Sequence, residues 1–214
     1  MALLSQNCKH VFSIATPKLL WAGLPVRKEE KMDQSQNKES KGQQRSQEET
    51  EMIIRPHLSK DGKTLDLTAL YLKELGVKDV SEFEFLKDLT TLEIGNNLMG
   101  PMGAKYLSQS KYLTNLTSLN LFYNKIGNDG IRYIAVSDNL LSLANLSLAD
   151  NDITDEGAKY LAKFLPLYSN LVRLDMRMNK ISEEGKNILQ EAQKLAGIKQ
   201  LLLDKVEGFQ VKSV

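Results

Sequence analysis

From Gly62 onward, hydrophobic and polar positions recur with a period of 27 or 28 residues. Four long units begin at leucines spaced 27, 27 and 28 residues apart: LTTLEIGNNLMGPMGAKYL from Leu89, LTSLNLFYNKIGNDGIRYI from Leu116, LANLSLADNDITDEGAKYL from Leu143 and LVRLDMRMNKISEEGKNIL from Leu171. Two shorter units flank them, GKTLDLTAL from Gly62 and IKQLLLDKV from Ile198. The shared pattern is L-x-x-L-x-L-x-x-N-x-I, then a glycine, then a helical stretch. Self-similarity at this period predicts a repeat architecture.

Each part of the pattern predicts one element. In the unit from Leu116, Leu119 and Leu121 lie two apart, as on the buried face of a short strand. An asparagine follows where the chain must turn, and its side chain can satisfy backbone groups that the turn leaves without partners, so stacked turns predict an asparagine ladder. A glycine six residues later lets the chain pass closely into an amphipathic helix. The asparagines are Asn97, Asn124, Asn151 and Asn179, and the glycines are Gly103, Gly130, Gly157 and Gly185.

One strand-turn-helix unit cannot cover its own apolar face, whereas stacked units can. The expected fold class is therefore α/β: a short, horseshoe-like solenoid with a parallel sheet on the concave side and helices on the convex side. We expect about six units, of which the first and last are atypical caps, because the asparagine position holds Leu70 in one and Val206 in the other. The insert VSEFEFLKDL, residues 80–89, is expected to form the helix of the first unit.

The repeat resembles the leucine-rich repeat family, and specifically its ribonuclease-inhibitor-like class, over residues 62–206. That resemblance implies protein binding on the concave sheet, through the variable residues that flank the strand leucines. A short, divergent array behind a polar leader also resembles the effectors that intracellular bacteria secrete. The resemblance thus favours an intracellular protein, delivered in that case into a host cell.

Stacking lines the variable residues into columns on the concave face. One column runs Asp66, Glu93, Asn120, Ser147, Asp175 and Leu202, and the next runs Thr68, Gly95, Phe122, Ala149, Arg177 and Asp204. A third, toward the turn, runs Asn96, Tyr123, Asp150 and Met178, and the far edge carries Thr91, Ser118, Asn145, Arg173 and Gln200. Aromatic, Arg and Met side chains around a small residue have the composition of an interface centre. The predicted partner-binding residues are Glu93, Asn120, Phe122, Tyr123, Asp150, Arg173, Asp175, Arg177 and Met178.

The rest of the chain is expected to be outside the repeats. Residues 27–51 are polar and contain no aromatic residue, which predicts a disordered linker. Residues 1–26 are basic and contain no acid, and three interpretations stay open: an organelle transit peptide, a flexible tail or an over-extended translation start with Met32 as the true one. Residues 52–88 are assigned to an N-terminal cap with the first, degenerate repeat, residues 89–197 to four repeats, and residues 198–214 to a C-terminal cap and tail.

Composition narrows the function further. A net charge of +1 gives no electrostatic attraction to nucleic acid, and no apolar run is long enough for a transmembrane helix. The only histidines are His10 and His57, the only cysteine is Cys8, and no P-loop or G-x-S-x-G motif is present. We therefore expect a monomeric, non-enzymatic protein that needs no metal or cofactor and binds another protein. The alternatives are a GTPase activator, an activity that also occurs on this repeat class, and an organellar assembly factor.

Overall fold

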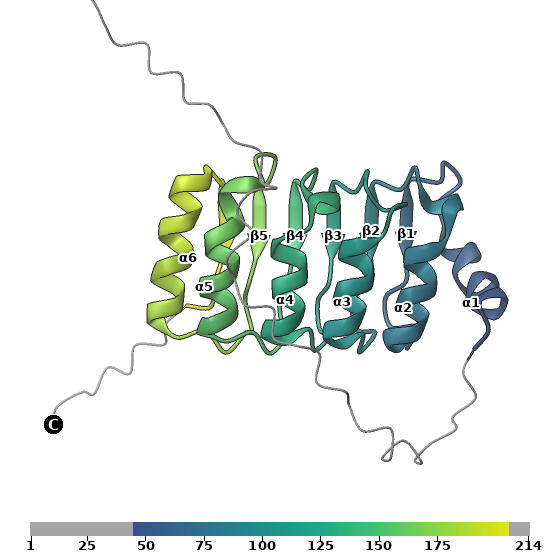
Figure 1. Cartoon of the computed structure of the whole chain (residues 1–214), viewed down its shortest axis with the longest axis horizontal. Helices are drawn as coiled ribbons and strands as arrows, with labels where there is room; N and C mark the ends of the chain where they lie inside the picture. Colours follow the sequence, from purple (N-terminus) through teal and green to yellow (C-terminus); the bar gives the residue numbers. More distant parts are fainter. Residues whose placement is uncertain (1–44, 206–214) are drawn as a thin grey trace, which may run out of the picture. The chain divides into compact units, whose positions relative to one another are not determined.

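The structure, a computed structural model, describes residues 45–205, and in this part strands and helices alternate along one array (Figure 1). The strands are β1 Thr64–Asp66, β2 Thr91–Glu93, β3 Ser118–Asn120, β4 Asn145–Ser147, β5 Arg173–Asp175 and β6 Gln200–Leu202. The helices are α1 Gln47–Ile54, α2 Lys73–Glu82, α3 Gly100–Gln109, α4 Gly127–Ala135, α5 Asp155–Phe164 and α6 Glu183–Ala196. Four 3₁₀ turns join them: η3 Arg55–His57, η4 Glu84–Leu86, η5 Asp138–Leu140 and η6 Leu165–Leu167.

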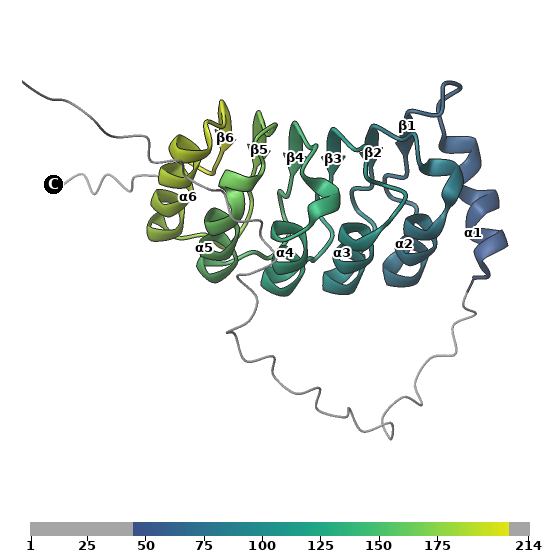
Figure 2. The same cartoon turned by 45° about the horizontal axis from the view of Figure 1, so that its top comes forward.

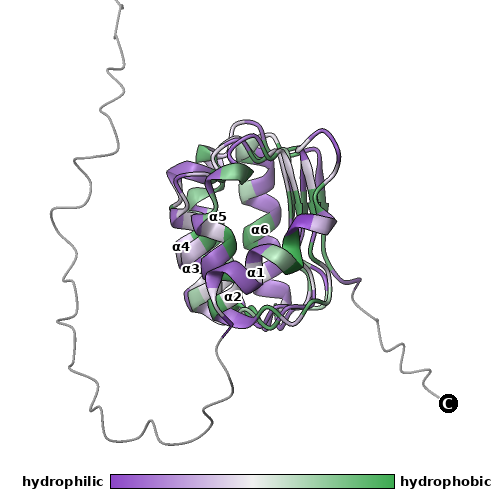
Figure 3. Cartoon of the chain, turned by 90° about the vertical axis from the view of Figure 1, so that its right-hand side faces the viewer, coloured by the Kyte–Doolittle hydropathy of each residue, from purple (hydrophilic) through white to green (hydrophobic). Residues whose placement is uncertain are grey.

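The six strands form one parallel sheet in sequence order, β1 to β6 (Figure 2). Seen along the array, the strands make one layer and helices α2 to α6 make the other, with apolar segments turned inward between them (Figure 3). The strand leucines are in register, Leu92 beside Leu119 and Leu119 beside Leu146, and at most 2% of each is exposed. Burying such a side chain stabilises the fold by about 2 kcal/mol, which explains why three-residue strands suffice. The predicted α/β solenoid is confirmed.

The asparagine ladder forms as expected. Asn124 is fully buried, and its Nδ2 donates to Ile94 O at 2.9 Å and to Leu121 O at 3.1 Å. Its Oδ1 accepts from Asn97 N at 2.9 Å, while its own backbone N–H donates to Asn151 Oδ1 at 2.9 Å. Each side chain therefore satisfies carbonyls and an N–H that the turn would otherwise leave buried without partners.

A glycine near the start of each of the helices α2 to α6 permits close packing. A Cβ added to Gly130 would collide with Ile126 Cγ2 and would lie 3.2 Å from Ala104 Cβ of the preceding helix. The extended residue before α5 is also fixed by the repeat before it, because Thr154 N donates to Asn128 Oδ1 at 3.0 Å. Ser182 before α6 is held likewise by Asp155, whose Oδ1 accepts from Ser182 N at 2.8 Å. Helix starts are thus positioned by neighbouring repeats as well as by local sequence.

The structure corrects two expectations near the N-terminal end. Residues 47–51, assigned to the disordered linker, lie in helix α1, which begins with a capping box between Ser46 and Glu49. The helix is stable because Ile54 is fully buried and Thr50 Oγ1 donates to Asp79 Oδ2 at 2.7 Å. The helix of the first repeat is α2, residues 73–82, so that the insert 80–89 supplies only its end and the turn η4.

The leader 1–26, most of the linker and the tail beyond residue 205 lie outside the described residues. Among residues 45–205, no helix combines the length and the apolar character that a membrane crossing needs.

Candidate functional site

The predicted columns exist on the sheet face opposite the helices. Asp66, Glu93, Asn120, Ser147, Asp175 and Leu202 are partners in strand register. Beyond the strands, backbone hydrogen bonds continue the alignment: Asn96 N donates to Phe122 O at 2.8 Å, Tyr123 N to Ala149 O at 3.1 Å, and Asp150 N to Arg177 O at 3.0 Å. Side chains 27 or 28 residues apart in sequence are therefore neighbours in space.

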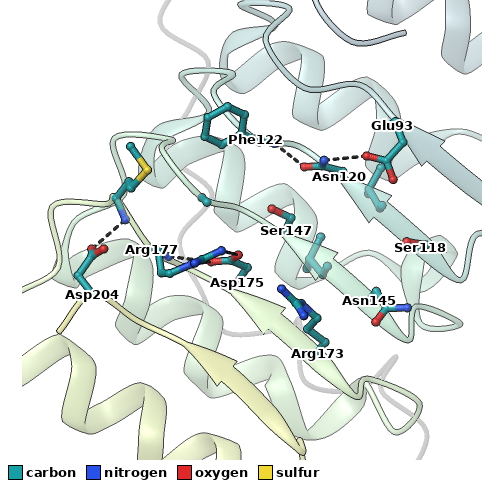
Figure 4. Close-up of a pocket in the computed structure, with 14 residues that line it drawn as sticks. Glu93, Ser118, Asn120, Phe122, Asn145, Ser147, Arg173, Asp175, Arg177 and Asp204 are labelled. Atoms are coloured by element: carbon teal, nitrogen blue, oxygen red, sulfur yellow. Dashed lines mark hydrogen bonds and ion pairs between the residues drawn. The ribbon is translucent and has the colours of Figure 1, made fainter. Parts of the chain in front are cut away.

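This face is hollowed over β3, β4 and β5, where an open depression of about 680 Å³ lies (Figure 4). Small side chains, Ser118, Ser147 and Ala149, help to line it, and larger ones stand around them. Seven predicted residues line the hollow: Glu93, Asn120, Phe122, Arg173, Asp175, Arg177 and Met178. The two others, Tyr123 and Asp150, do not line it and occupy the turns that follow the strands.

Large apolar side chains stand at the turn side of the hollow: Phe122 and Met178 line it, and Tyr123 packs beside Phe122. Phe122 is 38% exposed, Tyr123 is 40% exposed, and their ring centroids lie 6.0 Å apart. Met178, two repeats along, is 61% exposed. Neighbouring side chains therefore leave a substantial part of all three accessible.

Tyr123 and Met178 also have unusual backbone conformations. Their φ angles are +52° and +58°, in the left-handed region that disfavours residues with a Cβ. The equivalent positions of two other repeats hold Asn96 and Asp150, at +56° and +54°, and these residue types tolerate the region better. The turn has this conformation in five successive repeats, also at Ala69, whereas the large side chains of Tyr123 and Met178 are not needed to form it.

The charged residues of the hollow differ in how far they are already paired. Arg177 forms a two-pronged ion pair with Asp175, through Nε to Oδ1 at 2.9 Å and Nη2 to Oδ2 at 2.6 Å. Burial favours a raised pKa for the Asp175 carboxyl, but the hydrogen bonds and charge of Arg177 outweigh it and hold that pKa below its usual value. Arg177 is therefore engaged within its own repeat, by the last residue of β5.

Arg173 is the cation of the hollow that remains available for an ion pair with a bound molecule. It is exposed, it forms no ion pair with any described residue, and its one side-chain hydrogen bond, to Gln200 Oε1, is 3.5 Å long. By contrast, Glu93 accepts from Asn120 Nδ2 at 2.7 Å, and Asp204 accepts from Met178 N at 2.8 Å. An incoming carboxylate would meet Arg173 without displacing an existing ion pair.

Comparison with known families gives a match in the middle of the array. A model described as Leucine Rich repeat matches residues 112–135 and 141–162, which span the units that contain α4 and α5. The fold is a leucine-rich repeat solenoid. No curated protein matches the chain.

Leucine-rich repeats generally mediate protein–protein interaction, and the hollow lies on the sheet face where their variable residues gather. Seven further residues line it that the predicted set omits: the strand leucines Leu119 and Leu146, together with Ser118, Asn145, Ser147, Ala149 and Asp204. The last five stand in the columns that the sequence predicts, so repeat register is the signal that finds them. Within residues 45–205, no group of three His, Cys, Asp or Glu side chains is arranged to hold a metal ion.

Proposed function

We propose that this leucine-rich repeat protein is a non-enzymatic binding module that holds a segment of another protein in the hollow over β3 to β5. The observation that carries the proposal is the pair Tyr123 and Met178, whose large, exposed side chains occupy left-handed turn positions. Such residues destabilise the turn by about 1 kcal/mol each relative to glycine. Binding a partner explains why these costly residues occupy the turn, whereas folding alone does not.

The lining indicates what the bound segment presents. An apolar or aromatic side chain fits over Ser147 and Ala149, in contact with Phe122 and Met178. A carboxylate of the same segment pairs with Arg173, whose guanidinium is otherwise unpaired in the described part of the chain. Apolar anchors together with a charge partner are the usual composition of a binding centre.

Two finer assignments belong to the same proposal. The units of 27 and 28 residues, each with a helix of 9 to 14 residues after its strand, support a ribonuclease-inhibitor-like repeat type. An intracellular location, and delivery into a host cell as an effector, stay predictions from the sequence.

A phage-displayed library of random twelve-residue peptides, selected on the full chain, tests the proposal. We expect enriched peptides to combine an aromatic or aliphatic residue with a nearby Asp or Glu. Replacing both Phe122 and Tyr123 by Ala should weaken their binding at least about 10-fold, because truncating a buried aromatic anchor costs about 2 kcal/mol. Arg173→Glu should shift a repeated selection from acidic to basic peptides.

Leu167→Ala is the matched control, because Leu167 is 49% exposed and does not line the hollow. It should leave peptide binding unchanged. Peptides that bind the double variant as well as the native chain, with both folded by circular dichroism, would show that the hollow is not the binding site.

A further inference from the structure

The two ends of the solenoid are closed differently. At the N-terminal end α1 covers the first repeat, where Ile54, Leu65 and Leu67 are fully buried. At the other end Leu201 and Leu203 are partly exposed. The same positions one repeat earlier hold Leu174 and Met176, of which at most 1% is exposed. The apolar interior therefore reaches the surface beside β6, which is the last strand of the array (Figure 2).

The helical layer at this end is already closed. In inner repeats, Ala104 packs toward the next helix at Gly130, and Lys159 Nζ reaches Glu184 of the next helix at 2.7 Å. The equivalent positions of α6 hold Lys186 and Asn187. Polar side chains at the positions that contact a following unit are the mark of a terminal repeat. What can still be added is a strand beside β6 rather than another complete repeat.

The open edge of β6 is ready for pairing. In the inner repeats, Leu121 N donates forward to Ser147 O at 2.9 Å, and Thr117 O accepts from Asn145 N at 3.0 Å. By repeat register, residues 199, 201 and 203 turn their backbone groups to the open side of β6. Within the described residues β6 pairs only with β5. An unpaired edge of this kind readily accepts another strand.

We propose that this edge pairs with the same edge of a second copy of the chain, antiparallel, about a twofold axis at Leu202. In that register, Leu201 of each copy lies opposite Leu203 of the other on the core side. The exposed apolar ends of the two copies therefore cover each other. On the other face Leu202 meets its own copy, and the Gln200 amide lies opposite the Asp204 carboxylate.

The neighbouring registers fit less well. Centring the axis on Leu201 sets Lys199 against Leu203, and centring it on Leu203 sets Asp204 against Leu202. The Leu202 register does place Lys199 opposite Lys205, but both side chains are exposed and water screens their repulsion. Side-chain matching therefore selects one isologous arrangement, a dimer with a continuous twelve-stranded sheet, in place of the monomer expected from the sequence.

Site-specific crosslinking of the full chain tests this arrangement. In a Cys8→Ser background, Leu202→Cys should form an intermolecular disulfide on mild oxidation, since the two Cβ atoms face each other at a non-hydrogen-bonded pair. Gln200→Cys alone should not crosslink, whereas an equimolar mixture of the Gln200→Cys and Asp204→Cys chains should. Light scattering should give the native chain about twice its 24.1 kDa mass, and Leu202→Lys should restore the monomer.

Two outcomes would overturn the proposal. A native chain that stays monomeric at all concentrations, with no Leu202→Cys disulfide, would show that no second copy occupies the edge. If deleting residues 206–214 then produced the dimer and the disulfide, the chain's own C-terminal segment would be the native occupant. A dimer in which Gln200→Cys crosslinks as fast as Leu202→Cys would place the contact in another register or on another surface.

Discussion

Tyr123 and Met178 show how single residues can act against the stability of their own turn. Both residues have a positive φ because the turn after the strand takes the left-handed conformation at this position. In two other repeats the same position is occupied by Asn96 and Asp150. Both side chains are also accessible: Tyr123 is 40% exposed and Met178 is 61% exposed. Under the proposed function, stability and binding make opposite requirements of the same position.

Tyr123→Asn should stabilise the fold by about 1 kcal/mol, because Asn tolerates the left-handed region better than Tyr. The same change should weaken binding of peptides selected on the native chain by about 10-fold, through loss of an aromatic contact. Urea denaturation and fluorescence anisotropy measure the two effects.

Lys125→Asn is the matched control, since Lys125 has φ +55° and is exposed but, unlike Tyr123, has no ring packed beside Phe122 of the hollow. It should also stabilise the fold but leave binding unchanged. Equal binding losses in the two variants would contradict a specific role for the Tyr123 ring.

Among the elements, the asparagine ladder connects successive turns through buried hydrogen bonds. Asn151 is fully buried, its Nδ2 donates to Leu121 O at 2.8 Å and Ala149 O at 3.0 Å, and its Oδ1 accepts from Asn124 N at 2.9 Å. Three consecutive repeats therefore meet at one residue, since the backbone N–H of Asn151 donates to Asn179 Oδ1 at 3.0 Å.

Asn151→Ala should lower the free energy of unfolding by about 3 kcal/mol or more, because it leaves several buried backbone groups without partners at about 1–3 kcal/mol each. Asn145→Ala, at an exposed asparagine of the same repeat, should change it by less than about 0.5 kcal/mol. Chemical denaturation distinguishes the two, and comparable losses would contradict the ladder's role.

Repetition made the strands, the ladder and the columns predictable, because each is reinforced in successive units of the sequence. Helix α1 occurs once, and only its start is marked in the sequence, by the S-x-x-E capping box of Ser46 and Glu49. The tertiary contacts of Thr50 and Ile54 that hold it on the first repeat have no such local signal. The Asp175–Arg177 ion pair was missed although residues two apart on a strand share a face. Which cation remains free, Arg173 rather than Arg177, depends on side-chain geometry that the sequence does not contain.

At the scale of the whole array, stability depends on its ends, because inner repeats contact neighbours on both sides and terminal repeats do not. At the N-terminal end, α1 supplies the missing neighbour through Ile54, and Leu58 forms an isolated antiparallel bridge with Leu65. At the C-terminal end, the polar face of α6 closes only the helical layer.

Ile54→Ala should lower the free energy of unfolding by about 2–5 kcal/mol, since it leaves a cavity between α1 and the first repeat. Met52→Ala, on the same helix at a side chain that is 68% exposed, should have almost no effect. Thermal unfolding followed by circular dichroism provides the measurement. Similar effects of the two substitutions would mean that α1 does not act as a cap.

The single extra residue in the unit from Leu143 lies between Gly157 and Leu171, on the helical side. The turn η6 and buried Tyr168 take it up, and Tyr168 Oη donates to Ile134 O. The alignment of the strands is unchanged, since Leu146 pairs with Leu174 just as Leu119 pairs with Leu146. A length change on the helical side of a repeat therefore leaves the columns of the sheet face aligned, so that the length of a unit and the side chains it presents on that face can vary separately.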